Sequence, residues 1–98
     1  SKSTAVTLNK PSGRVTFHNS TLAAGASVLV DIISTFASNS STGTAALVIG
    51  LTANYWDYSV EVVACGGGRL TIRLTNLSAS PMTQSEVLSF NIIAGATS

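Results

Sequence analysis

The sequence predicts an all-β domain: a two-sheet antiparallel sandwich of the immunoglobulin-like kind, with a jelly roll as the alternative. Short segments of alternating apolar and polar residues are separated by runs of Gly, Pro, Ser, Thr and Asn, and no helical repeat continues beyond one turn. About seven short strands in roughly 100 residues are typical of a sandwich. Because the chain holds one Cys, it lacks the cysteine pair that marks immunoglobulin domains, and both topologies stay open.

The first half of the chain contains four expected strands. They are residues 5–8, 14–18, 27–33 and 45–51. Their predicted core positions are Val15, Phe17, Val28, Val30, Ile32, Leu47 and Ile49, and Leu51 lies on the same face as Leu47 and Ile49. The third strand differs from the others because it also carries Leu29 and Ile33 on its opposite face, which indicates a central strand or an interface.

The second half contains three more expected strands. They are residues 58–64, 69–75 and 87–93. Their predicted core positions are Val60, Val62, Leu70, Ile72, Leu74, Leu88, Phe90 and Ile92, and Tyr58 and Ala64 lie on the same side of their strand as Val60 and Val62. The middle strand alternates most regularly, so Arg69, Thr71 and Arg73 should lie on the opposite face from Ile72. Three consecutive glycines, 66–68, predict a short hairpin before it.

The charge content excludes several classes of partner. Charged residues make up 9% of the chain, and the net charge is +1. Five cations offset by four anions form a poor phosphate-binding footprint, so we expect no nucleic acid partner. Since no apolar run reaches about 18 residues, we expect no membrane partner either.

Few residues could carry chemistry. The chain has one histidine, His18, and four dispersed carboxylates, so we expect no metal, no cofactor and no catalytic residues, and predict that the protein is not an enzyme. Cys65 stands at an apolar strand end and is expected to pack as a small hydrophobic side chain. Asn19, Asn39 and Asn76 begin N-glycosylation acceptor sequences, most of which chance explains at this Ser and Thr content.

The most distinctive cluster is aromatic. Tyr55, Trp56 and Tyr58 are three of the six aromatic residues, with Asn54 and Asp57 among them. Three interpretations remain open: Trp56 caps the core, the cluster forms a subunit interface, or the rings stack on a sugar while the polar side chains bind its hydroxyls. The candidate ligand-binding residues are Tyr55, Trp56, Asp57 and Tyr58.

Four segments of the chain carry a resemblance to a known group of proteins. They are residues 1–19, 22–28, 68–79 and 86–92. Together they resemble a short β-rich module of tailed-phage and prophage virion structural proteins. The resemblance implies that residues 1–98 are a single domain, a terminal module of a longer chain, in a tail fibre, tail spike or capsid surface. Residues 33–51 and 55–58 depart from the module.

We therefore expect a non-catalytic virion module for fibre or capsid-surface assembly and host attachment, with other virion proteins and a host-surface glycan as partners. The alternative is a carbohydrate-binding module of a secreted bacterial protein, which a coplanar platform of Tyr55, Trp56 and Tyr58 would favour. A hydrolase would need His18 beside a Ser and a carboxylate. We also expect a homo-oligomer, with Leu29, Ile33 and Trp56 as interface candidates; the expectation of a trimer rests on the resemblance.

Overall fold

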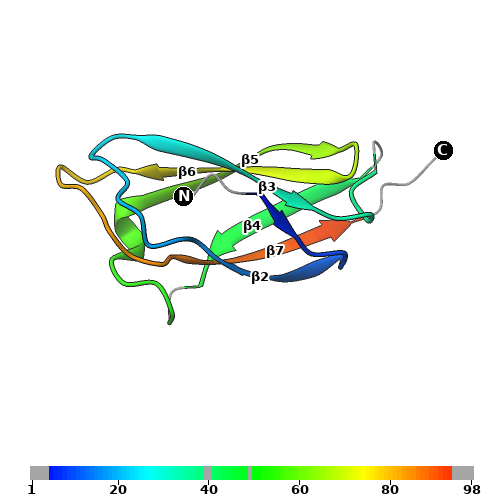
Figure 1. Cartoon of the computed structure of the whole chain (residues 1–98), viewed down its shortest axis with the longest axis horizontal. Helices are drawn as coiled ribbons and strands as arrows, with labels where there is room; N and C mark the ends of the chain where they lie inside the picture. Colours follow the sequence, from blue (N-terminus) through cyan, green and yellow to red (C-terminus); the bar gives the residue numbers. More distant parts are fainter. Residues whose placement is uncertain (1–4, 39–40, 49, 94–98) are drawn as a thin grey trace.

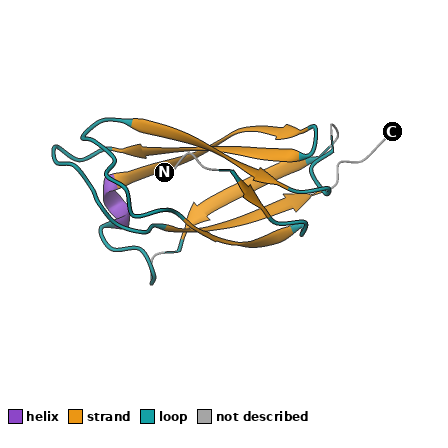
Figure 2. Ribbon diagram, viewed as in Figure 1, coloured by secondary structure: helices purple, strands orange, loops and turns teal. Residues whose placement is uncertain are grey.

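The computed structural model describes residues 5–38, 41–48 and 50–93, and there the chain forms two β-sheets packed face to face (Figures 1 and 2). The elements are β1 (Val6–Thr7), β2 (Ser12–Thr16), β3 (Ser27–Ile33), β4 (Thr42–Leu47), the 3₁₀ helix η1 (Tyr55–Asp57), β5 (Tyr58–Gly66), β6 (Arg69–Asn76) and β7 (Val87–Ile93). The predicted all-β sandwich is confirmed. No helix among the described residues is long and apolar enough to span a membrane.

One sheet has the order β1-β3-β6-β5 and the other the order β2-β7-β4. All pairs of neighbouring strands are antiparallel except β1 and β3, which are parallel. Four strands facing three is the division seen in constant-type immunoglobulin domains. Most connections cross from one sheet to the other, so strands far apart in the sequence become neighbours.

The core lies between the sheets and is made by the inward half of each alternating strand. Its buried apolar residues are Val15, Phe17, Leu22, Val30, Ile32, Ala37, Tyr58, Leu70, Ile72, Leu74, Leu88, Phe90 and Ile92. Four predicted core residues, Val28, Leu47, Val60 and Val62, are half-buried and pack against this set. Strand β6 is central in its sheet, which explains why its apolar side chains are completely covered.

The outer face of the four-stranded sheet carries the charged residues that alternate with this core. Arg69 forms an ion pair with Asp31 (3.2 Å), and Arg73 forms one with Glu61 (2.8 Å). Thr71 donates a hydrogen bond to Asp31 (2.6 Å). The predicted outward orientation of the β6 polar residues is therefore confirmed.

The prediction of a strand at 45–51 was wrong at both ends. Strand β4 begins at Thr42, and Leu51 lies exposed in a turn whose backbone N–H donates to the Val48 carbonyl (3.0 Å). Thr52 stops further pairing, because its hydroxyl donates to the Val87 carbonyl (3.2 Å) and accepts from the Val87 N–H (3.0 Å). Ile49 lies outside the described residues.

A β-bulge changes the inward face of β5. The register against β6 shifts between Val62 and Ala64, so Val63 is an extra residue in the strand. Ala64 was predicted to lie on the same side as Val60 and Val62 but is exposed, and Cys65 packs against the core in its place. Burial raises the pKa of the Cys65 thiol, as expected for the small hydrophobic side chain predicted there.

The domain is elongated, with extents of 46 × 22 × 21 Å, so its two ends are well separated. We call the end that carries η1 the loop end; it contains the β2–β3, β4–β5 and β6–β7 connections (Figure 1). We call the opposite end the hairpin end, because β5 turns there into β6. Gly67 and Gly68 have positive φ values of 61° and 82°, which form the predicted turn.

Candidate functional site at the loop end

Three connections are tied together at the loop end by hydrogen bonds. Leu22 and Met82 exchange backbone bonds of 2.8 and 2.9 Å, which join the β2–β3 and β6–β7 connections. The side-chain amide of Gln84 donates to the Ala53 carbonyl (2.6 Å), which adds the β4–β5 connection. The three connections at this end therefore form one hydrogen-bonded surface and are not independent loops.

The side chain of Asn76 joins the β2–β3 and β6–β7 connections at this end through hydrogen bonds. Its Nδ2 donates to the carbonyls of Leu22 (3.0 Å), Ala23 (3.3 Å) and Ser80 (2.9 Å). Its Oδ1 accepts from the backbone N–H of Ser78 (2.9 Å) and from the Ser78 hydroxyl (2.7 Å). The side chain is 0% exposed, so Asn76 has a structural role and its acceptor sequence is not accessible for glycosylation in the folded domain.

The helix η1 places two aromatic rings at the surface. Asn54 precedes it with a left-handed backbone (φ 55°), and the Asp57 N–H donates to the Asn54 carbonyl (2.9 Å). The rings of Tyr55 and Trp56 have centroids 5.2 Å apart and planes at 80°, an edge-to-face contact. Trp56 is 65% exposed, so the interpretation of this ring as a cap of the core was wrong.

Tyr58, and not Trp56, contributes its ring to the core at this end. It is the first residue of β5, lies in phase with Val60, and is 7% exposed. A coplanar platform of Tyr55, Trp56 and Tyr58 is therefore not formed, since one ring is buried and the other two are nearly perpendicular. The arrangement that would have favoured a sugar-stacking platform is absent from these three residues.

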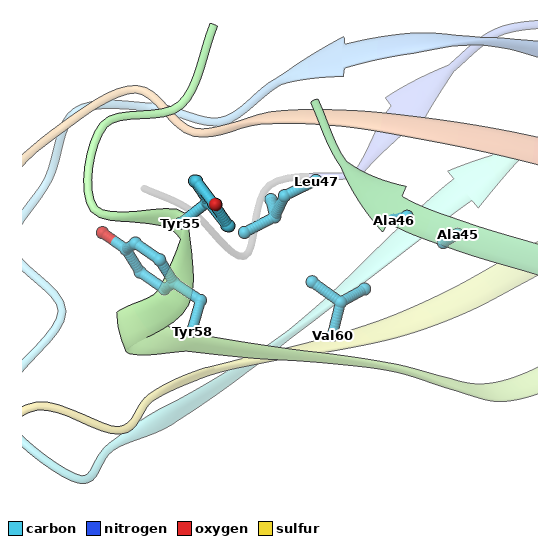
Figure 3. A pocket seen from close by; sticks show the side chains of 6 residues that line it. All are labelled: Ala45, Ala46, Leu47, Tyr55, Tyr58 and Val60. Carbon is cyan, nitrogen blue, oxygen red and sulfur yellow. The ribbon is translucent and has the colours of Figure 1, made fainter. Parts of the chain in front are cut away.

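A cavity of about 260 Å³ opens between the edges of β4 and β5, next to η1 (Figure 3). Its lining residues are Ala45, Ala46, Leu47, Tyr55, Tyr58 and Val60. The side chains that line it are those of alanine, leucine, valine and tyrosine. Two of the predicted ligand-binding residues, Tyr55 and Tyr58, thus line one cavity, while Trp56 and Asp57 are not among its lining residues.

Tyr58 lies near the buried carboxyl of Glu86, which is completely covered. Burial of Tyr58, and next the adjoining carboxylates of Glu86 and Asp57, raise the pKa of the Tyr58 hydroxyl. The neutral phenol is therefore the form that the folded domain favours.

This shift predicts a loss of stability in alkali. The unfolded chain releases the Tyr58 proton near pH 10.0. Above that pH the unfolded state binds fewer protons than the folded state, so the free energy of unfolding falls as the pH rises. Urea denaturation at about pH 8 and about pH 11 should show a smaller loss for Tyr58→Phe than for the unmodified chain. Equal losses would contradict the assignment to Tyr58.

The remaining titratable groups lie in other places. His18 is exposed, and its Nδ1 accepts a hydrogen bond from the Ser20 backbone N–H (3.2 Å). Asp31 and Glu61 are the ion-paired carboxylates of the outer sheet face. In residues 5–38, 41–48 and 50–93 no three His, Cys, Asp or Glu side chains lie together in a group that could hold a metal ion.

The three interface candidates do not form one surface. Leu29 and Ile33 are exposed on the outer face of β3, but Asp31, with its Arg69 ion pair, stands between them. Ile33 pairs with Arg69 at the hairpin end, whereas Trp56 lies at the loop end. An oligomer that buries all three would have to cover most of the length of the sheet.

Comparison with known proteins identifies no relative of this chain. No family model, curated protein or solved structure matches it.

Proposed function

We propose that this domain is a non-catalytic structural module of a bacteriophage virion, part of a tail-fibre or capsid-surface protein, and that its loop end contacts another virion protein or the host surface. The observation that carries the proposal is the exposed edge-to-face pair of Tyr55 and Trp56. Leu51 and Leu77 are exposed at the same end. Large aromatic side chains surrounded by a polar rim are typical anchors of protein interfaces.

Two further features support a role in assembly. The resemblance to phage virion modules is carried by four segments that are distributed between residues 1 and 92. The outer face of the three-stranded sheet is composed mainly of small uncharged residues, and Arg14 is its one charged residue within the described strands. Such faces suit close subunit contacts without like-charge repulsion. A homo-oligomer, in particular a trimer, is part of this proposal, and the number three depends on the resemblance.

Immunoelectron microscopy tests the location. Antibodies against the purified domain should label fibres or capsids of particles released by the bacterium that encodes it. Labelling that is confined to soluble secreted protein would overturn the virion proposal. In that outcome, retention of the domain by a polysaccharide would favour the carbohydrate-binding alternative.

Trp56→Ala tests the role of the loop end. We expect binding to particles lacking the protein, or to host cells, to weaken about 10-fold or more, because a central aromatic anchor is lost. Since Trp56 is exposed, the urea midpoint should remain nearly unchanged. Val63→Ala, which shortens an exposed side chain on the β5 bulge, is the matched control and should bind normally. Unchanged binding by Trp56→Ala would contradict attachment through this end.

A further inference from the structure

The free edge of β4 lacks the protection that the other sheet edges carry. In the described sheets the edges are β1, β5, β2 and β4. Strand β1 has two residues, β2 carries Arg14 and follows Pro11, and β5 carries Glu61 and a bulge at Val63. Short length, charge, proline and bulges are the devices that prevent edge pairing. Strand β4, with six residues TGTAAL, has no charge, no proline and no bulge within its described register.

The direction of the β4 backbone groups follows from its pairing with β7. The Val48 N–H donates to the Val87 carbonyl (2.8 Å), so Val48 directs its N–H toward β7. In an antiparallel ladder this direction alternates along the strand. Gly43, Ala45 and Leu47 therefore direct their N–H and C=O groups away from β7, toward the free edge. These backbone groups can form hydrogen bonds with another β-strand.

We propose that β4 pairs with β4 of a second copy of this chain, antiparallel about a twofold axis at Ala45. This inference rests on the homo-oligomer proposed above, and it replaces the trimer that the resemblance implies with a dimer. It joins two three-stranded sheets, β2-β7-β4 and its copy, into one continuous sheet. The proposed occupant is a second copy, because a strand with no charged residue can pair antiparallel with itself without placing like charges opposite each other.

The twofold axis determines which residues meet. Ala45 lies opposite itself, Gly43 lies opposite Leu47 of the partner subunit, and Thr44 lies opposite Ala46 of the partner subunit. Thr44 and Ala46 are small and exposed on the outer face, so the joined surface is flat. Pairing also covers the cavity rim at Ala45 and Leu47.

Isologous pairing is favoured over pairing with a different edge. A contact of β4 with β2 or β5 of a second copy would meet Arg14 or the β5 bulge. A twofold β4 contact uses the unprotected strand twice and closes on itself, so it makes a dimer and not a filament.

Sedimentation and a proline substitution provide the first test. At a protein concentration of about 100 µM, the domain should sediment as a dimer with twice the 10.0 kDa mass of one chain. Ala45→Pro should weaken association about 10-fold or more, because the Ala45 N–H faces the free edge, where proline is tolerated in the monomer. Ala46→Pro is the control for the ladder: it removes a bond to β7 and should lower the unfolding midpoint as well.

Cysteine crosslinking tests the register even if Ala45→Pro fails to fold. In a Cys65→Ser background, an equal mixture of Thr44→Cys and Ala46→Cys chains should form a disulfide-linked heterodimer on oxidation. Each variant alone should crosslink little, because its cysteines then stand on a diagonal about 7–8 Å apart, beyond disulfide reach.

Four outcomes would each overturn the pairing. They are a monomer at every concentration, a trimer, a dimer that Ala45→Pro does not affect, and a mixture of the two cysteine variants that does not crosslink. Failure of this inference and failure of the proposed function are distinguishable. A monomer that still labels virions leaves the virion proposal standing, whereas a β4-paired dimer that is absent from virions overturns the proposed function and leaves the pairing.

Discussion

Ile72→Ala is expected to lower the free energy of unfolding by about 2–5 kcal/mol. Ile72 lies in the middle of β6, between Val30 of β3 and Val62 of β5, and is 0% exposed. Shortening a side chain there removes buried methyl groups and leaves a cavity, since two hydrogen-bonded neighbours hold β6 in place. Urea denaturation followed by circular dichroism measures the change.

Leu29→Ala is the matched control for this experiment. Leu29 lies on the neighbouring strand but on the outer face, where about half of it is exposed. Its truncation should cost well under half as much as that of Ile72, because little surface returns to water. A loss below about 1 kcal/mol for Ile72→Ala would contradict the central burial of β6.

Asn76→Asp should lower the free energy of unfolding by about 3 kcal/mol or more at neutral pH. The substitution keeps the shape but replaces the Nδ2 that donates to the Leu22, Ala23 and Ser80 carbonyls. A carboxylate cannot donate, so these acceptors would face a negative charge in a buried site. The loss should shrink in acid, because protonation restores one donor.

Asn91→Asp makes the same chemical change on an exposed side chain of β7 and should change stability by less than about 0.5 kcal/mol. Denaturation at about pH 4 and about pH 7 separates the two positions, since only the buried substitution should show a strong pH dependence. Similar small losses of stability at both positions would contradict the role of the Asn76 side chain in joining the loops by hydrogen bonds.

The alternation of the sequence predicted strands best where one face is fully buried. The predicted bounds of β3 (Ser27–Ile33) and β7 (Val87–Ile93) agree with the structure. Strand β4 was misplaced because an edge strand buries little and needs few apolar residues, so TGTAAL carries a weak signal. Leu47 and Leu51 keep the same alternation beyond the end of β4, and for this reason the predicted strand extended to residue 51.

The candidate site was predicted in part. Sequence reasoning found the aromatic cluster but did not find which ring is buried, although Tyr58 shares the phase of Val60 and Val62 and so carried that signal. The Val63 bulge leaves no mark in the pattern, since an extra residue is defined only against the partner strand. The cavity between β4 and β5 depends on tertiary packing of two edges.

The strand order also governs how the chain reaches this structure. Among the described strands, β5 and β6 are the one pair of sequence neighbours that are also neighbours in a sheet. Pairing of β2 with β7 brings Ser12 beside Asn91, so one sheet requires the two ends of the chain to meet. Non-local pairing of this kind slows folding to roughly milliseconds to seconds. The β5–β6 hairpin can form first. The uncharged strand β4 has no partner in its sheet until β7, the last strand in the sequence, pairs with it.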